Sequence, residues 1–179
     1  MKILKPARRV DAVPQVNVAD LAAQGVQGVI IDLDNTLTEW NQNHLCPEIA
    51  RWLEELERYG IKLCILSNNK KHRVQSFAEA CGVPYISNAR KPWRRGFRRA
   101  MNLLGTRPEQ TVVIGDQIFT DVLGGNRSGL YTILVNPISR REFLGTRLVR
   151  QLERWVLRER SPRRGHKQLF RSKTKEGQP

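Results

Sequence analysis

Cysteine is scarce in this sequence, and long apolar runs are absent. The three cysteines among 179 residues, Cys46, Cys64 and Cys81, are odd in number and show no C-x-x-C spacing, which fits a reducing cytosol. No apolar stretch is long enough to span a bilayer, and no apolar region follows the basic segment 1–9 as it would in a signal peptide. We therefore expect a cytoplasmic protein that is neither secreted nor integral to a membrane.

Acidic residues are also few compared with basic ones. The sequence has 31 Lys and Arg against 17 Asp and Glu, a formal net charge of +14. This excess favours an anionic partner, and charge alone leaves open whether that partner is nucleic acid, an anionic membrane or a phosphorylated substrate. The length of 179 residues suits one compact domain with a loose tail rather than two domains.

The stretch V-I-I-D-L-D-N-T-L, residues 29–37, combines the pattern of a buried strand with two acidic residues. Because side chains alternate along a strand, Asp32 and Asp34 are expected to leave the same face while Leu33 points into the core. Two carboxylates held so close repel each other unless a cation or a shared proton offsets the cost. Mg2+ would supply that charge, and the pair could then divide nucleophilic attack and proton transfer between them.

The same stretch has two simpler interpretations. A strand that ends in an Asx turn capping a helix would also read D-x-D-N-T. A calcium-binding loop of the D-x-D-x-[DN]-G type is excluded, because Leu37 stands where that loop requires Gly and Asn43 where it requires Glu. The choice between an Asx turn and a catalytic pair therefore depends on the rest of the chain.

Short apolar strands alternate with amphipathic helices through most of the sequence. This alternation predicts right-handed crossovers and a parallel sheet with helices on both faces, which is a three-layer α/β fold with five strands. Residues 1–16 are expected to be irregular and to pack along the edge of the domain. The expected strands are 29–33, 61–66, 82–87, 111–114 and 130–135, and the expected helices are 18–24, 47–59, 74–81, 92–104 and 121–128.

Polar residues follow four of the five expected strands. A parallel sheet brings such residues together at the carboxyl ends of its strands. Taken singly, each has an ordinary interpretation: a serine caps a helix, a lysine lies on the surface, and aspartates stabilise turns. Their joint placement at four strand ends indicates one site instead. The residues are Asp32 and Asp34, then Ser67, then Lys91, then Asp116 and Asp121.

The order of these residues resembles the haloacid dehalogenase (HAD) superfamily of phosphohydrolases, whose motifs are D-x-D-x-T, a Ser or Thr, a Lys, and G-D-x(3–4)-D. The matching letters are D-L-D-N-T at 32–36, L-S-N-N at 66–69, K-P at 91–92 and G-D-Q-I-F-T-D at 115–121. The resemblance covers roughly residues 25–136. It is closest to the YqeG-type members of subfamily IIIA, a branch that also contains phosphatidylglycerophosphate phosphatases. It implies a Rossmann-like (HAD-like) three-layer sandwich.

The resemblance also implies a role for each acidic residue. Asp32 would be the nucleophile that becomes an aspartyl phosphate, and Asp34 the general acid that then activates water. Mg2+ would be the cofactor, held by Asp32, the backbone carbonyl of Asp34 and Asp116, with waters and a phosphate oxygen completing the octahedron.

Ser67 and Lys91 would bind and neutralise the oxygens of the transferring phosphoryl group. Asp121 and Asn68 would act indirectly, through the residues that touch the metal or the substrate.

The spacing of the motifs also bears on the substrate. Only 32 residues separate Asp34 from Ser67, and 23 separate Ser67 from Lys91, so neither gap has room for a cap domain. In the family that the chain resembles, caps select small metabolites. A member without a cap is expected to have an open site suited to large substrates or to surfaces.

The C-terminal part of the sequence differs from the predicted phosphatase domain, residues 1–136. Apolar residues recur at helical spacing over 137–160 with arginines between them, which predicts a basic amphipathic helix. That helix could lie on an anionic membrane or pack on the domain. Residues 161–179 are rich in Arg, Lys, Gly and Pro and are expected to be disordered. Such a polybasic segment binds anionic lipid and RNA alike.

Three functions remain open at this point. The first is a Mg2+-dependent phosphomonoesterase that acts on a membrane lipid, most plausibly phosphatidylglycerophosphate, from the inner face of the membrane. The second is a phosphatase of nucleotides or polynucleotide ends, which the few aromatic residues near the motifs make less favourable. The third is a non-enzymatic protein that binds RNA or the ribosome, against which the intact aspartate pair argues. The oligomeric state stays open.

Overall fold

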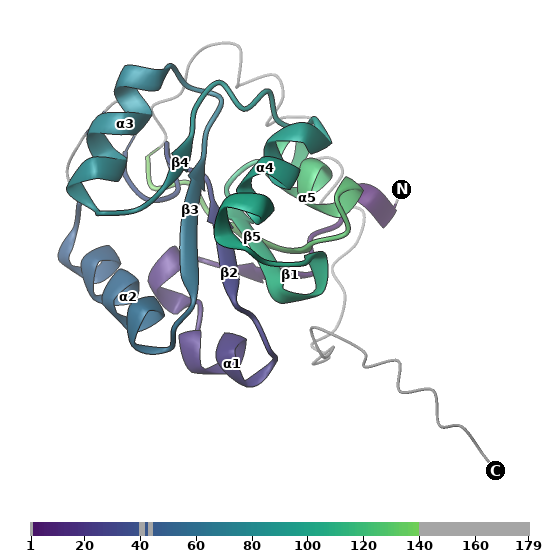
Figure 1. Cartoon of the computed structure of the whole chain (residues 1–179), viewed down its shortest axis with the longest axis horizontal. Helices are drawn as coiled ribbons and strands as arrows, with labels where there is room; N and C mark the ends of the chain where they lie inside the picture. Colours follow the sequence, from purple (N-terminus) through teal and green to yellow (C-terminus); the bar gives the residue numbers. More distant parts are fainter. Residues whose placement is uncertain (1, 40–41, 43–44, 140–179) are drawn as a thin grey trace.

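A six-stranded parallel sheet forms the centre of the fold in the computed structural model, which describes residues 2–39, 42 and 45–139 (Figure 1). The strands lie in the order β1-β6-β5-β2-β3-β4, and each pair of neighbours runs parallel. Their bounds are β1 Arg8–Val10, β2 Gly28–Ile31, β3 Lys62–Leu66, β4 Tyr85–Ile86, β5 Thr111–Gly115 and β6 Tyr131–Val135.

Five α-helices connect the strands in the described part of the chain. Local signals mark the start of two of them. The Asn17 side chain accepts a hydrogen bond from the Asp20 N–H at the N-terminus of the first helix, and Pro47 is the first residue of the second. The bounds are α1 Val18–Ala23, α2 Pro47–Arg58, α3 Lys71–Ala80, α4 Arg94–Leu104 and α5 Leu123–Arg127, with 3-10 turns at Lys2–Leu4, Val13–Gln15 and Pro108–Gln110 and a π-helical turn, η4, at Ile118–Val122.

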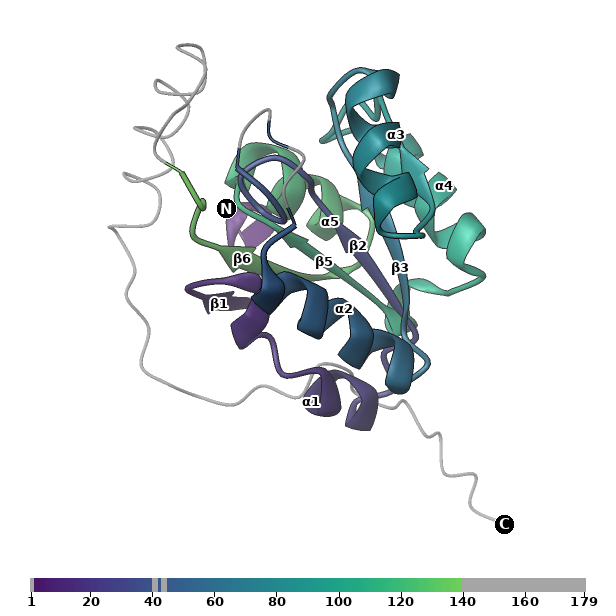
Figure 2. The same ribbon diagram turned by 90° about the vertical axis from the view of Figure 1, so that its left-hand side faces the viewer.

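The helices cover both faces of the sheet, because the strands are apolar on both sides. Val29 and Ile31 of β2 pack in one apolar cluster with α1, α2 and α3, while Ile30 between them packs on the other face with α4. Figure 1 shows α2 and α3 on one side of the sheet and α4 and α5 on the other, and Figure 2 looks onto the face that α2 covers. The three-layer prediction is confirmed.

The prediction of five strands is wrong, because residues 1–16 contain a sixth. Arg8–Val10 forms β1 and pairs with β6, with Val10 opposite Val135. A three-residue edge strand with two arginines has no apolar alternation to reveal it, and its partner lies more than a hundred residues away in the sequence. Charged residues are common on edge strands, since they prevent pairing with another chain.

The chain reverses direction across the sheet beside β2, and this determines where a site can form. It proceeds from β2 outward to β3 and β4, then returns to β5 on the other side of β2. The crossovers therefore leave the carboxyl ends of β2 and β5 in opposite directions, and open α/β sheets place their sites at such a point. Asp32 and Asp116 directly follow these two strands. The Asp32 N–H donates to the Ile114 carbonyl at 3.0 Å, which ties the two strand ends together.

No additional domain stands over this edge of the sheet in the described residues, as the short gaps between motifs predicted. The stretches after β2 and β3 form α2 and α3, which pack on the sheet. Within the same residues, no helix has the length and apolar character needed to cross a membrane. The described residues end at 139. Almost all of the helix predicted over 137–160, and the whole tail 161–179, therefore lie outside the described part of the chain.

Candidate active site

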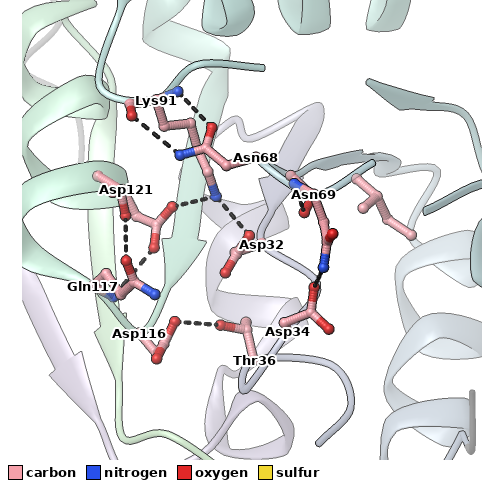
Figure 3. Close-up of polar contacts among 12 residues, drawn as sticks. Asp32, Asp34, Thr36, Asn68, Asn69, Lys91, Asp116, Gln117 and Asp121 are labelled. Carbon is pink, nitrogen blue, oxygen red and sulfur yellow. Dashed lines mark hydrogen bonds and ion pairs between the residues drawn. The ribbon is translucent and has the colours of Figure 1, made fainter. Parts of the chain in front are cut away.

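Lys91 lies buried between two carboxylates at the carboxyl edge of the sheet (Figure 3). Its Nζ is 2.6 Å from Asp32 Oδ1 and 2.7 Å from Asp121 Oδ1, and its side chain is 3% exposed. Burial by itself would lower the pKa of Lys91, but the charges of Asp121 and Asp32 outweigh it and raise the pKa overall. Lys91 is therefore a charged member of the site and not the surface lysine of the simpler interpretation.

Asp32 is held by Lys91 at a place that water scarcely reaches. Burial raises the pKa of its carboxyl group to about 7, although Lys91 opposes the shift. The nearby charges of Asp121 and Asp34 add to the increase. The ionised form of this group has little water around it, so its lone pairs are available for attack on an electrophile.

Three buried carboxylates approach one another beside Lys91. Asp32, Asp116 and Asp121 each offer an oxygen, and these oxygens lie within 4.8 Å of one another. The Thr36 hydroxyl donates to Asp116 Oδ1 at 3.4 Å and steadies it from the D-x-D-N-T turn. A cluster of hard oxygen atoms matches the ligands that Mg2+ prefers, so the residues present fit this ion.

Asp121 is bound by protein on both oxygens. Oδ1 pairs with Lys91, and Oδ2 accepts the Gln117 N–H at 3.2 Å from the start of η4. This approach requires glycine at 115, because an added Cβ there would lie 2.3 Å from Asp121 Cγ. The predicted helix 121–128 begins earlier than expected, since η4 starts at Ile118 and turns Asp121 back toward the strand end.

Asp34 belongs to a second group of contacts, formed with α3 and the loop before it. Asn69 Nδ2 donates to Asp34 Oδ2 at 3.2 Å, and an Arg73 guanidinium nitrogen lies 3.0 Å from Asp34 Oδ1. Arg73 is 6% exposed and also donates to the Gln42 carbonyl, so it links α3 to the loop after the D-x-D turn. The carboxylate of Asp34 is thus held apart from the three-carboxylate cluster, as a metal contact through its backbone alone would require.

Ser67 and Asn68 lie in the turn after β3. Ser67 is buried, and its Oγ accepts the Asn69 N–H at 3.1 Å. It does not cap the next helix, because α3 begins only at Lys71. Asn68 binds the backbone of Lys91 at two points: its Oδ1 accepts the Lys91 N–H at 2.6 Å and its Nδ2 donates to the Lys91 carbonyl at 3.2 Å. The contact of Asn68 with the site thus passes through Lys91, in keeping with an indirect role.

All of these residues fall within one matched family region. The model of the haloacid dehalogenase-like hydrolase family matches residues 19–129. The chain belongs to this HAD hydrolase family. Among curated relatives, "Probable phosphatase YqeG" of Bacillus subtilis is 43% identical over 92% of this chain and 95% of its own length.

Two further similarities are more distant. "Phosphatidylglycerophosphate phosphatase 1, chloroplastic/mitochondrial" of Arabidopsis thaliana is 27% identical over 83% of this chain, which spans about half (49%) of that protein's length. The solved structure of NagD from E. coli K-12 has a TM-score of 0.53 and 17% identity, covering 68% of this chain and 91% of NagD. At that identity the structural likeness shows the HAD fold alone.

The sequence did not reveal Arg73 or Asn69 as site residues, and both contact Asp34. The prediction treated the helix around 74–81 as an ordinary amphipathic helix. The signal was nevertheless present, because Arg73 stands four residues before Phe77 and eight before Cys81, on the apolar face. A charged residue on the buried side of a helix requires a partner of opposite charge, and that partner is Asp34.

Proposed function

We propose that this protein is a Mg2+-dependent phosphatase that hydrolyses phosphomonoesters through an aspartyl phosphate on Asp32. The observation that carries the proposal is the 2.6 Å pairing of Asp32 with Lys91 inside a buried group of three carboxylates at the carboxyl edge of the sheet. Neither a turn nor a helix cap requires such a burial of charge. Burying charge costs free energy, and clusters of buried charged groups are therefore typical of functional sites.

The first step transfers the phosphoryl group to the enzyme. Asp34 is ionised beside Arg73 in the free protein, so it must take up a proton as the substrate binds. Asp32 attacks phosphorus, the P–O bond to the ester oxygen breaks, and Asp34 gives that proton to the leaving oxygen. Lys91, already beside Asp32, neutralises charge on the phosphoryl oxygens, and the Ser67 hydroxyl donates a hydrogen bond to one of them.

The second step returns Asp32 to its starting state. Asp34, now ionised, takes a proton from water as the water oxygen attacks phosphorus. The P–O bond to Asp32 breaks, inorganic phosphate leaves, and the Asp32 carboxylate and the protonated Asp34 are both restored. Arg73 and Asn69 hold Asp34 in one orientation through both proton transfers.

Asp32, Asp116 and the backbone carbonyl of Asp34 would hold Mg2+. When bound, the ion supplies positive charge beside the transferring phosphoryl group. Asp121, whose oxygens are engaged by Lys91 and Gln117, would position Lys91.

As natural substrate we propose a membrane lipid phosphate of the phosphatidylglycerophosphate kind, reached from the inner face of the membrane. The Arabidopsis relative that bears this substrate in its name supports it, as do the absence of a cap over the described site and the net charge of +14. A phosphate ester embedded in a bilayer can enter only a site with no roof.

The test is release of inorganic phosphate by the purified full-length chain. We expect p-nitrophenyl phosphate to be hydrolysed with Mg2+ and not with EDTA, and phosphatidylglycerophosphate in vesicles to be preferred over nucleotides and 5′-phosphorylated RNA. No hydrolysis of any ester with Mg2+ would refute the phosphatase proposal, whereas preference for nucleotides or RNA ends would refute only the lipid substrate.

Arg73→Met should slow the second step about 100-fold, because Asp34 loses its buried partner and the orientation needed for proton transfer. p-Nitrophenolate leaves without a proton, so the first step with that substrate should change little. Acid-quenched samples should then show phosphoenzyme accumulating in a burst that the native enzyme lacks.

The matched control is Arg51→Met, which removes an exposed arginine from α2. It should behave like the native enzyme. Equal slowing of both steps by Arg73→Met would show that this residue only supports the fold.

A further inference from the structure

The outer face of α4 carries an unusual concentration of positive charge. One side of this helix is buried on the sheet through Phe97, Ala100 and Leu104. No acidic residue occurs in the sequence between Glu79 and Glu109, whereas seven basic residues do. We call the exposed arginines of the helix, together with the tryptophan before it, the α4 face. Its residues are Trp93, Arg94, Arg95, Arg98 and Arg99.

Among the described residues, no carboxylate compensates the positive charges of the α4 face, although Arg94 Nε donates to the Arg127 backbone carbonyl at the end of α5. In the part of the chain that the structure describes, none of its four arginines forms an ion pair with a carboxylate. Arg94 and Arg95 lie in the first turn, where the helix dipole disfavours cations, and Arg94–Arg98 and Arg95–Arg99 are repulsive pairs four residues apart. The arginines therefore make an unfavourable electrostatic contribution to the stability of the helix. A polyanionic partner would offset that contribution.

Exposed apolar side chains lie at both ends of this helix. Trp93 is 63% exposed and Leu103 55% exposed. The guanidinium of Arg127 lies 5.7 Å from the centre of the Trp93 ring and holds the ring at the surface. Arginines flanked by exposed Trp and Leu suit the headgroup region of a bilayer. Proteins that bind single-stranded RNA combine positive charge with several aromatic rings for base stacking, whereas this face exposes one aromatic ring, that of Trp93.

The α4 face begins next to the active-site residue Lys91. Trp93 is two residues after Lys91, and α4 starts from the same carboxyl edge of the sheet (Figure 1). A surface that contacts Trp93, Arg94 and Arg95 would therefore lie next to the uncapped site.

We propose that the α4 face docks the protein on an anionic lipid bilayer. The lipid phosphate as substrate rests on the proposed function, but docking itself requires no catalysis. Vesicle binding tests the docking proposal and phosphate release tests the proposed function, so either proposal can be refuted without the other.

The experiment is co-sedimentation of the full-length chain with vesicles of phosphatidylcholine, with and without phosphatidylglycerol. Arg95→Gln/Arg98→Gln should weaken binding to the anionic vesicles at least about 10-fold. The control Arg51→Gln/Arg58→Gln removes the same charge from α2 and should weaken binding less than about 3-fold. Trp93→Ala should weaken it about 3–10-fold.

Turnover of p-nitrophenyl phosphate should be unchanged in the Arg95→Gln/Arg98→Gln variant, because neither residue touches the site. Its melting temperature should be unchanged or higher, since a repulsion is removed. Equal weakening by the two double variants would overturn the proposal in favour of unspecific attraction. It would also be overturned if the α4 variant bound vesicles as tightly as the native chain. Absence of native vesicle binding, with RNA binding that needs Arg95 and Arg98, would assign the face to nucleic acid.

Discussion

Asp32→Asn should lower the turnover of every phosphomonoester by at least about 10,000-fold, because the neutral amide cannot attack phosphorus. The amide oxygen can still accept a hydrogen bond from Lys91 Nζ, which lies 2.6 Å from Asp32 Oδ1 in the native protein. The shape of the site should therefore survive. The measurement is phosphate release in single and multiple turnovers, together with a search for phosphoenzyme after acid quench. Substantial residual turnover would refute the assignment of Asp32 as nucleophile.

The same variant has a distinct pH signature in the absence of metal. Burial raises the pKa of Asp32 to about 7 in the folded protein, against an ordinary value of 3.8. The folded state therefore holds this proton where the unfolded state has lost it, and the native protein loses stability as pH rises from about 4 to about 7. The amide of the variant has no such proton. With EDTA, the free energy of unfolding of the variant should increase relative to that of the native protein as pH rises through this range. If the two free energies changed with pH in the same way, the burial argument would be contradicted.

Lys91→Met should be nearly as damaging, and it should affect both rate and stability. Asp32 and Asp121 would lose their common cation in a buried place, which costs about 3–5 kcal/mol when one partner of a buried ion pair is removed. Charge on the phosphoryl oxygens would also lose its partner, lowering kcat about 100- to 1,000-fold. Urea unfolding with EDTA and steady-state kinetics with Mg2+ measure the two effects separately.

Lys71→Met is the matched control for this prediction. Lys71 is an exposed lysine at the first position of α3, so the same chemical change there should leave both stability and rate close to native. Near-native kinetics for Lys91→Met would mean that its ion pairs serve the fold alone.

The sequence predicted the layers of the fold and most of the residues at its edge. Val29, Ile30 and Ile31 are apolar in succession, which only a strand covered on both faces tolerates, and the structure places helices on both faces. Strands that alternate with helices must run parallel, so their polar ends had to share one edge. Asp32 and Lys91 could therefore be placed near each other although Lys91 follows Asp32 by 59 positions.

The sequence alone missed the features that depend on contacts between distant segments. β1 was missed because two of its three residues are arginines and its pairing depends on β6 at the other end of the domain. Arg73 was missed because its partner Asp34 precedes it by 39 residues, and local pattern does not connect a helix to a strand end.

The acids, the lysine and the strand ends that carry them can be identified from local periodicity and turn chemistry in the sequence. How the acids divide into two groups depends on tertiary contacts. Asp32, Asp116 and Asp121 gather around Lys91, whereas Asp34 turns to Arg73 and Asn69. The physical reason is that charge pairing in a buried site depends on distances of a few ångströms between side chains from different crossovers. Those distances exist only after the sheet has formed and the helices have packed on it.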